Sequence, residues 1–377
     1  MSPVDIAARR IARWLLAALG AVMVACAPAP NLALAAEEAP ATAPAPGDVH
    51  MKDFRFASGE TLPDLRLHYW TLGVPKRDAG GHVTNAVVLL HGTGGDGLSF
   101  LRPQFSGELF GPGQPLDTRS HYIIMIDAIG HGGSSKPSNG LHMRFPAYDY
   151  ADMVTAAHRL VTEHLAVQRI RLLFGTSMGC MHAFVWAETY PDDVAAVMPM
   201  ACLPAPIAGR NRIWRSMVIS AIRHDPDWKG GEYDREPVAG LRVAADLLFI
   251  AGSAPHQDQK TWPTRAAADA FVAAGEAALP GKVDANDLIY QLDASRTYDP
   301  TAGLGRITAP LLWINSADDF INPPSLGIAE ALAPRIATGR FVLLPISERT
   351  HGHGTHTWAT AWKDLMVDFL QRTEPAH

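Results

Sequence analysis

A serine flanked by glycines carries the clearest sign of chemistry in this chain. Residues 175–179 read Gly-Thr-Ser-Met-Gly, with Ser177 at the centre. Residues 170–174 before the motif, which are mostly apolar, predict a buried strand, and residues 181–190 after it have the composition of a helix. A strand that turns this tightly into a helix raises the serine hydroxyl above the end of a sheet, where a histidine can take its proton. We therefore predict that Ser177 is a nucleophile.

Two backbone amides are candidates for binding the oxyanion that such a nucleophile creates. One is the N–H of Met178, at the start of the helix after Ser177. The other lies in residues 91–95, His-Gly-Thr-Gly-Gly, which follow an apolar strand predicted over residues 86–90, and we assign it to Thr93. The glycine spacing matches neither nucleotide-binding fingerprint and no lysine follows, so we expect no phosphate-binding site and no cofactor.

The acid of a serine, acid and histidine triad is expected on the turn after a late strand, here predicted over residues 310–315. Asp318 and Asp319 compete for this role. One of them should face the site, and the other should cap the turn or the helix predicted over residues 325–332.

The base is expected in the loop after the last predicted strand, residues 340–344. This loop carries His351, His353 and His356. Three histidines so close together also suggest zinc, but acidic and cysteine ligands at fixed spacing are missing, so we predict no metal site. His131, in another glycine-rich loop, is expected to be structural rather than catalytic.

The elements that must position these loops are strands alternating with helices. A hairpin is predicted over residues 53–57 and 65–71, and a later strand over residues 122–126. An amphipathic helix is predicted over residues 152–165, and a closing helix over residues 358–370. This order predicts an α/β fold with a mainly parallel central sheet, flanked by helices and connected by right-handed crossovers.

Residues 204–308 break this alternation. They contain helical pieces separated by glycine and proline pairs, and no strong strand. An insertion of this kind predicts a helical lid over the ends of the strands, where ligands bind in such sheets. A separate domain without contact to the site is disfavoured because the core strands resume directly afterwards. We thus expect a core formed by residues 51–203 and 309–377.

The N-terminal segment differs in kind from the rest. Arginines precede an apolar run over residues 14–25, which is too short to span a bilayer as a stable helix, so an uncleaved membrane anchor is disfavoured. We interpret residues 1–36 as an export signal and residues 37–50, rich in Ala, Pro and Glu, as a flexible linker. Residues 33–35, Ala-Leu-Ala, offer a cleavage site, whereas lipoprotein-type processing would leave a lipid anchor on Cys26. The mature protein is expected to be periplasmic or secreted, touching a membrane only through that anchor.

The net charge of the chain bears on whether it binds nucleic acid. The 377-residue chain has a net charge of −6 and no basic stripe, so nucleic acid is not an expected partner.

Beyond the export signal, Cys180 and Cys202 are the cysteines that remain in the sequence. In an oxidising compartment they could pair, and two small buried thiols are the alternative; the sequence leaves this open. It also leaves the oligomeric state open, with a homodimer as one candidate.

Longer stretches resemble a known family of α/β-hydrolase fold enzymes, the homoserine O-acetyltransferase-like family. Residues 175–183, Gly-Thr-Ser-Met-Gly-Cys-Met-His-Ala, look like its nucleophile turn, with Trp-Ala at 186–187 and Tyr-Pro at 190–191. Residues 221–228, Ala-Ile-Arg-His-Asp-Pro-Asp-Trp, and Gly-Glu-Tyr at 231–233 are similar to its lid. The resemblance covers nearly all of the chain after about residue 50. It implies an α/β-hydrolase fold with a lid.

The resemblance also implies a choice among the rival triad residues. It places the nucleophile on Ser177 and the acid on Asp319, which precedes Pro323 in an Asp-x-x-x-Pro pattern. The base falls on His353, which stands in a Gly-His pair. The sequence alone and the resemblance thus agree on Ser177, and the resemblance adds Asp319 and His353.

Two departures from the family concern the substrate. The family carries an Asp directly after the catalytic His to hold the amino group of homoserine, and Gly354 stands there in this chain. The Arg that binds the substrate carboxylate falls on Ile219. Because acetyl-CoA is a cytoplasmic metabolite, we expect an exported serine esterase that cleaves a small-molecule carboxylic ester through an acyl-Ser177 intermediate. An acyltransferase with the same triad is the alternative, and a catalytically silent binding protein is disfavoured because every triad position is filled.

Overall fold

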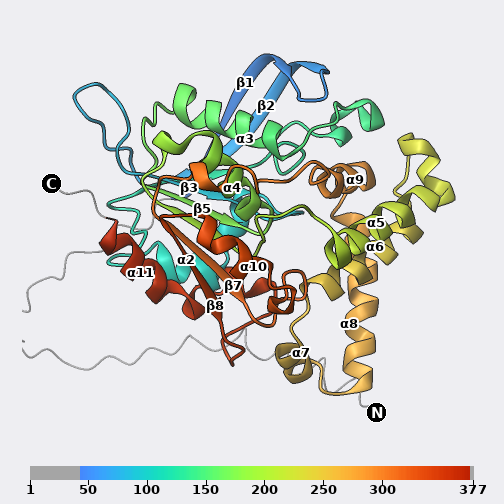
Figure 1. The fold of residues 1–377 in the computed structure, drawn as a ribbon. Coiled ribbons are helices and arrows are strands. Elements are labelled where there is room, and N and C mark those ends of the chain that lie inside the picture. Colours follow the sequence, from blue (N-terminus) through green and yellow to red (C-terminus); the bar gives the residue numbers. More distant parts are fainter. Residues whose placement is uncertain (1–42, 374–377) are drawn as a thin grey trace, which may run out of the picture. The chain divides into compact units, whose positions relative to one another are not determined.

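A single mixed sheet forms the centre of the computed structural model, which describes residues 43–373 (Figure 1). Its strand order is β1-β2-β4-β3-β5-β6-β7-β8. The pairs β1 with β2 and β2 with β4 are antiparallel, and the remaining pairs are parallel. The strands are β1 (Ala45–Arg55), β2 (Thr61–Leu72), β3 (Ala86–Leu90), β4 (Tyr122–Ile126), β5 (Leu172–Thr176), β6 (Val197–Met200), β7 (Leu311–Ser316) and β8 (Gly339–Leu344). The predicted mainly parallel sheet is confirmed.

Helices cover both faces of this sheet. On one face, α3 (Tyr150–Arg159) and α4 (Met178–Thr189) pack in one apolar cluster with the strands. On the other face, α2 (Pro103–Leu109) and α11 (Lys363–Arg372) pack in a second cluster. The strands β3, β4, β5 and β7 are buried along their whole length. They therefore consist of apolar runs or begin with one, which is why the sequence marks them so clearly.

Two helices differ from their predicted bounds because of their ends. The helix predicted over residues 152–165 begins at Tyr150, since the Asp149 side chain accepts hydrogen bonds from the N–H groups of Ala151 and Asp152. It continues after Arg159 as one π-helical turn to His164. The helix predicted over residues 358–370 is wrong at its start, because its first residues form a 3₁₀ turn over 359–361 and α11 follows.

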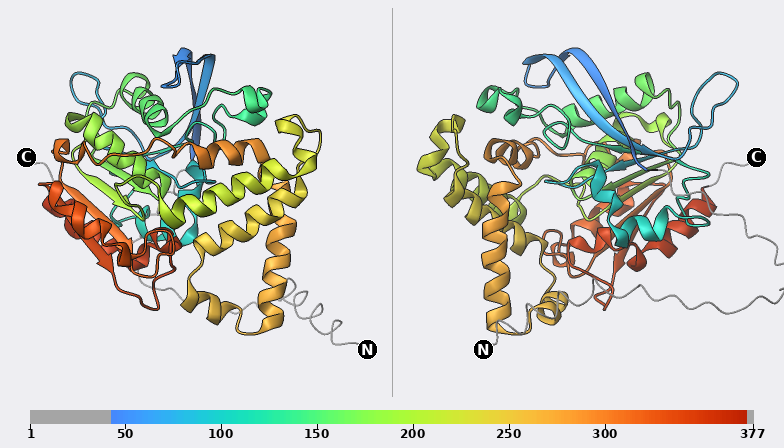
Figure 2. Two further views of the ribbon diagram at one scale, coloured as in Figure 1. Left: turned by 45° about the vertical axis from the view of Figure 1, so that its right-hand side comes forward. Right: turned by 180° about the vertical axis from the view of Figure 1, so that it is seen from behind.

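The residues between β6 and β7 form a helical lid with its own apolar cluster. Figure 2 shows these helices beside the sheet rather than on one of its faces. The lid contacts the core directly, because the Gln291 side chain donates a hydrogen bond to the Gly130 carbonyl at 2.8 Å and Asp287 accepts from Ser138. Its helices are α5 (Gly209–His224), α6 (Val238–Gly252), α7 (Pro255–Thr261), α8 (Arg265–Ala278) and α9 (Ala285–Asp293). The short α10 (Ile328–Leu332) lies between β7 and β8.

Strand β1 corrects the prediction of a linker up to residue 50. It begins at Ala45 and pairs with β2 from Ala45 opposite Thr71 to Arg55 opposite Thr61. Only Met51 and Phe54 of this strand are buried, so its sequence has few apolar positions to mark it as a strand. The predicted export signal, residues 1–36, and the rest of the linker lie outside the described residues.

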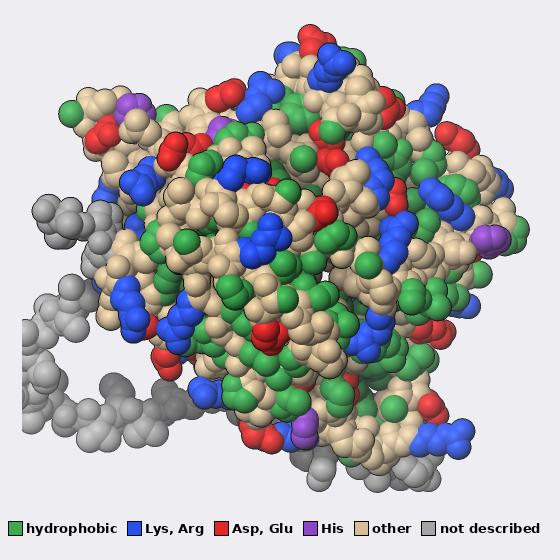
Figure 3. All heavy atoms as spheres, in the orientation of Figure 1, with side chains coloured by type: hydrophobic (Ala, Val, Ile, Leu, Met, Phe, Trp, Pro, Cys, Tyr) green, Lys and Arg blue, Asp and Glu red, His purple; other side chains and the backbone are tan. Residues whose placement is uncertain are grey.

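On the face seen in Figure 3, acidic and basic side chains are interspersed, and neither kind gathers into a patch of its own.

Within residues 43–373, no single helix is long and apolar enough to cross a membrane. The helices α6 and α7 pass that test only as a pair bent by 114°.

Cys180 and Cys202 form a disulfide, with their Cα atoms 5.9 Å apart. The bond joins the first turn of α4, just after Ser177, to the loop after β6. The structure thus answers the question that the sequence left open, in favour of pairing.

Reducing this disulfide should lower the free energy of unfolding. It closes a loop between residues 22 positions apart, and loop-closure entropy assigns about 3 kcal/mol to a loop of that size. The test is guanidinium unfolding with and without reductant, with the double variant Cys180→Ala/Cys202→Ala as a control that should not respond to reductant. Identical unfolding curves of the unsubstituted protein in both conditions would contradict the disulfide.

Candidate active site

Ser177 occupies a strained turn between β5 and α4. Its φ of 55° and ψ of −112° lie outside the regions that L-residues ordinarily adopt. The flanking glycines allow this turn: a Cβ on Gly175 would lie 2.0 Å from the carbonyl oxygen of Gly179, and a Cβ on Gly179 would lie 1.9 Å from that of Leu90. The sequence motif therefore has a steric cause, because any larger residue at either position would push the serine away from the sheet.

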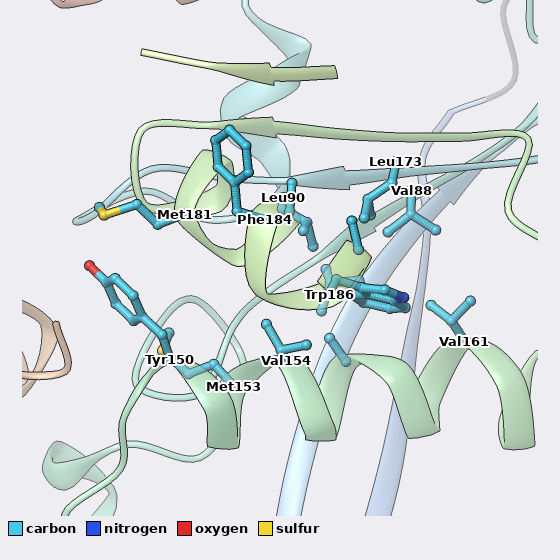
Figure 4. Packing of buried hydrophobic residues seen from close by; sticks show 14 of the residues in the cluster. Val88, Leu90, Tyr150, Met153, Val154, Val161, Leu173, Met181, Phe184 and Trp186 are labelled. Carbon is cyan, nitrogen blue, oxygen red and sulfur yellow. The ribbon is translucent and has the colours of Figure 1, made fainter. Parts of the chain in front are cut away.

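The helix that follows Ser177 is held firmly in place. Trp186 and Phe184 of α4 are fully buried, and Figure 4 shows them between α3 and the strands, with Val154 and Val161 on one side and Leu173 on the other. The Ser177 N–H itself donates to the Met200 carbonyl of β6 at 2.9 Å. Packing of this kind fixes the serine relative to the sheet rather than leaving it on a mobile loop.

Three side chains from distant parts of the chain meet at this turn. The Nε2 atom of His353 lies 2.8 Å from the Ser177 Oγ atom, and its Nδ1 atom lies 2.9 Å from an Asp319 carboxylate oxygen. Asp319 is fully buried and His353 is 11% exposed at its side chain. These are the distances and the order expected for a nucleophile, a base and an orienting acid. The structure thus brings together Ser177 and the two residues that the family resemblance assigned to a triad with it.

The surroundings of Asp319 favour its ionised form. Burial acts to raise the pKa of this carboxyl, but the adjacent His353 and the hydrogen bonds from Asn322 outweigh burial and hold the pKa below its usual value. The Asn322 side chain donates to one Asp319 oxygen at 2.9 Å, and the N–H of Ile321 donates to the other at 2.7 Å. Asn322 also donates to the Ala201 carbonyl at 3.0 Å, so it ties the acid to the end of β6.

Asp318 has a different role from the one its position predicted. It does not cap the following helix; one of its oxygens accepts a hydrogen bond from the Gly352 N–H at 3.0 Å, and the other accepts from the Ser316 hydroxyl. Gly352 has a φ of +56°, and a Cβ on it would lie 2.3 Å from the Ser253 carbonyl oxygen of the lid. Asp318 therefore positions the loop that carries His353.

The other histidines lie apart from the Ser177 hydroxyl. The ring of His351 stacks on Trp358 at 3.9 Å. His356 is buried next to His353, and burial, with a smaller effect of His353, lowers its pKa to about 3, which keeps it neutral. Its Nδ1 atom makes no hydrogen bond to the described residues. His131 packs against His91 in the core.

Two cavities meet at Ser177 and His353. The larger, of about 520 Å³, lies under the lid and is lined mainly by apolar residues from the loop after β6, by α5 and by the loop after Asp319. The smaller, of about 220 Å³, is lined by the glycine-rich loop after β3, by Arg102 and by His356. The Ser177 side chain therefore borders two cavities.

A model of the alpha/beta hydrolase fold matches residues 85–333, more than half of the chain. The chain belongs to this family. A probable acyltransferase of Methanothermobacter thermautotrophicus is 29% identical over 277 residues, covering 73% of this chain and 83% of that protein. A homoserine O-acetyltransferase of Geotalea daltonii is 27% identical over 307 residues, covering 72% and 82%. The structure of an acetylester hydrolase from Corynebacterium glutamicum superposes with a TM-score of 0.76 at 21% identity, covering 87% of this chain and 96% of that one.

Within this α/β hydrolase, the predicted oxyanion amides are uncommitted. The N–H groups of Thr93 and Met178 donate no hydrogen bond to any group in residues 43–373. Thr93 lines the smaller cavity together with Ser177, and a Cβ on Gly92 would lie 3.2 Å from the Ser177 Cβ atom. Both amides are therefore free to bind an oxygen of a ligand.

The sequence did not reveal the residues that position Asp319 and His353. Asn322 is the example. Asn322 precedes a proline, which is a signal for a turn, but nothing in the sequence indicates that its side chain bonds to both Asp319 and Ala201.

Within the described part of the chain, no group of three or more His, Cys, Asp or Glu side chains is arranged to hold a metal ion.

Proposed function

We propose that this α/β hydrolase is a serine esterase that cleaves a small-molecule carboxylic ester. The observation that carries the proposal is the hydrogen-bonded chain from Ser177 through His353 to Asp319, which opens to two cavities. All three groups are in the relative positions that acyl transfer to a serine needs.

The reaction would proceed in two halves. The Ser177 Oγ atom attacks the carbonyl carbon of the ester while the His353 Nε2 atom takes its proton, and Asp319 stabilises the resulting imidazolium. The Thr93 and Met178 N–H groups would bind the oxyanion, and His353 would then give its proton to the departing alcohol. Water attacks the acyl-Ser177 carbonyl in the second half, with His353 again as the base, and the carboxylic acid leaves.

Acyl transfer to an alcohol or an amine is the second candidate, since it uses the same first half. The names of the relatives, an acyltransferase and a homoserine O-acetyltransferase, favour it. Two residues favour hydrolysis: Gly354 stands where the family's amino-group ligand belongs, and Ile219 stands where its carboxylate ligand belongs. We therefore place water ahead of homoserine as the acceptor.

A chain-length panel of p-nitrophenyl esters separates the two functions. Initial rates are measured with and without alcohol and amine acceptors, homoserine included. An esterase should release p-nitrophenol at a rate that is independent of the acceptor and should produce the free acid. Turnover that appears only with an acceptor, with the acyl group found on it, would establish the transferase instead.

We further propose that the enzyme acts outside the cytoplasm. The apolar run after the N-terminal arginines supports export, and so does the Cys180–Cys202 disulfide, because such bonds persist in oxidising compartments. Neither nucleic acid nor a membrane surface is proposed as a partner, beyond the alternative of a lipid anchor on Cys26.

Export predicts a shortened N-terminus. Mass spectrometry of the protein from a bacterial envelope fraction should find a mature chain that begins near Ala36 or, after lipid modification, at Cys26. A chain that retains Met1 would contradict both forms of processing.

A further inference from the structure

An arginine that pairs with no carboxylate among residues 43–373 lies at the wall of the larger cavity. Arg215 projects from α5 of the lid and lines the cavity that also contains Ser177 and His353. Only 2% of the residue is exposed, and its Nη1 atom makes no hydrogen bond with any described residue. A buried guanidinium with an unsatisfied donor is costly, and proteins usually pair it.

The neighbours of Arg215 do not neutralise its charge. Its Nε atom donates to the Asn211 side-chain oxygen at 2.9 Å, and its guanidinium carbon lies 4.9 Å from the centre of the Trp214 ring. Tyr150 is close enough to interact, but burial raises the pKa of its phenol, so Tyr150 stays uncharged. Burial lowers the pKa of Arg215 from its ordinary value, yet arginine remains protonated at neutral pH. The positive charge is thus present and facing the cavity.

The rest of the cavity wall does not supply an anion either. Besides Arg215, the charged side chain on this wall is Arg210, and no Asp or Glu among the described residues lines it. Arg210 packs over the Phe320 ring at 3.9 Å and donates to the Phe320 carbonyl. Asp319 lies behind His353 and is committed to it. A ligand in this cavity therefore meets a positive field within an apolar enclosure, where charge interactions are strong.

Arg215 is not the carboxylate position that the family resemblance marks. That position falls on Ile219, one helical turn further along α5, which is buried in the lid cluster and does not line the cavity. The next arginine on the same helix, Arg212, points elsewhere, to Asp293 at 3.6 Å. Of these three positions on α5, only Arg215 combines burial, an unsatisfied donor and access to Ser177.

We propose that Arg215 binds a carboxylate carried by the substrate, so that the preferred esters are anionic. The proposal rests on the proposed esterase function and adds a substrate class to it. A carboxylate fits because the planar guanidinium can donate two parallel hydrogen bonds to its two oxygens. The carboxylate can belong to the acyl part or to the alcohol part of the ester, since both parts lie beside Ser177 when it attacks the ester carbonyl.

Two matched pairs of esters test the proposal and separate these sources. The acyl pair is p-nitrophenyl pentanoate and the mono-p-nitrophenyl ester of glutaric acid. The alcohol pair is butyl acetate and 4-acetoxybutanoate. The wild-type enzyme should favour the anionic member of at least one pair by roughly 10- to 100-fold in kcat/KM, the range expected for a hydrogen-bonded charge. Equal or lower kcat/KM for both anionic members would overturn the proposal.

Variants at Arg215 then connect the preference to this side chain. Arg215→Met should remove the preference while keeping turnover of the neutral esters, which also shows that the variant is folded. Arg215→Lys should retain part of the preference, because it keeps a charge but not the paired geometry. Arg212→Met, on the same helix and outside the cavity, should behave as the wild type. A preference that survives Arg215→Met would overturn the proposal.

A measurement on the unsubstituted protein tests the proposal even if Arg215→Met fails to fold. Pentanoate, an anion with an apolar tail, should slow fluorophosphonate labelling of Ser177 at concentrations at least roughly tenfold lower than 1-pentanol does, because a hydrogen-bonded charge contributes that much affinity. Equal protection by the two compounds would overturn the carboxylate site. Failure of the esterase function itself gives another pattern, in which no ester of either pair is turned over while pentanoate still protects Ser177.

Discussion

Replacing Ser177 with Ala should lower ester turnover by roughly 10⁶-fold, the loss seen when the nucleophile of a serine triad is removed. The Ser177 Oγ atom is 2.8 Å from the base and lies at the junction of both cavities. Without it no acyl-enzyme can form, and only binding and the oxyanion amides remain. Turnover of p-nitrophenyl acetate by the purified variant is the measurement.

A fluorophosphonate probe gives the same test without a substrate. It should label Ser177 alone in the wild type, identified by mass spectrometry of the labelled peptide, and should leave Ser177→Ala unlabelled. Ser58→Ala is a suitable control, since Ser58 lies in the exposed turn between β1 and β2 and its side chain hydrogen-bonds with Glu60, far from Ser177 in the fold. Labelling that persists in Ser177→Ala would show that another residue is the nucleophile.

The core of the fold was predictable because its strands are buried on both faces. Residues 86–90 and 172–174 are apolar without interruption, and the glycines around Ser177 mark the turn that follows. Strand β1 was partly missed, since most of its side chains are exposed and its start is rich in Ala and Pro. The start of α3 was misplaced by two residues because the cap at Asp149 precedes the apolar pattern.

The three residues that meet at the turn after β5 were found in two ways. The glycines around Ser177 mark that residue directly, whereas the choice of Asp319 over Asp318, and of His353 over His351 and His356, came from the family resemblance. The contacts that support the triad have no such signal. The tie from Asp318 to Gly352 and the approach of Arg215 to Ser177 depend on distances between segments that are far apart in the sequence. The sequence left the pairing of Cys180 and Cys202 undecided for the same reason, because pairing depends on the distance between their Cα atoms.

Adjacent rival residues allow a stringent test of the triad. Asp319→Asn should lower kcat by about 10⁴-fold, since an amide in place of the orienting carboxylate stabilises the wrong tautomer of the histidine. Asp318→Asn should cost far less, because this carboxylate holds the Gly352 N–H and the Ser316 hydroxyl and does not contact His353. An Asn at residue 318 can still accept the Gly352 hydrogen bond. If Asp318→Asn is the inactive variant and Asp319→Asn is not, the assignment of the acid is wrong.

The histidines give the corresponding comparison for the base. His353→Ala should lower kcat by several orders of magnitude, because no other group is within hydrogen-bonding distance of the Ser177 hydroxyl in the described part of the chain. His356→Gln should retain most of the activity: His356 is buried beside His353 without a hydrogen bond at Nδ1, and its pKa of about 3 leaves it uncharged when the reaction creates an imidazolium next to it. A neutral neighbour hardly destabilises the His353 imidazolium, whereas a positively charged neighbour would destabilise it by repulsion. The measurement is kcat of both variants on one p-nitrophenyl ester, with circular dichroism to show that each is folded. A folded His356→Gln as inactive as Ser177→Ala, together with an active His353→Ala, would move the base to His356.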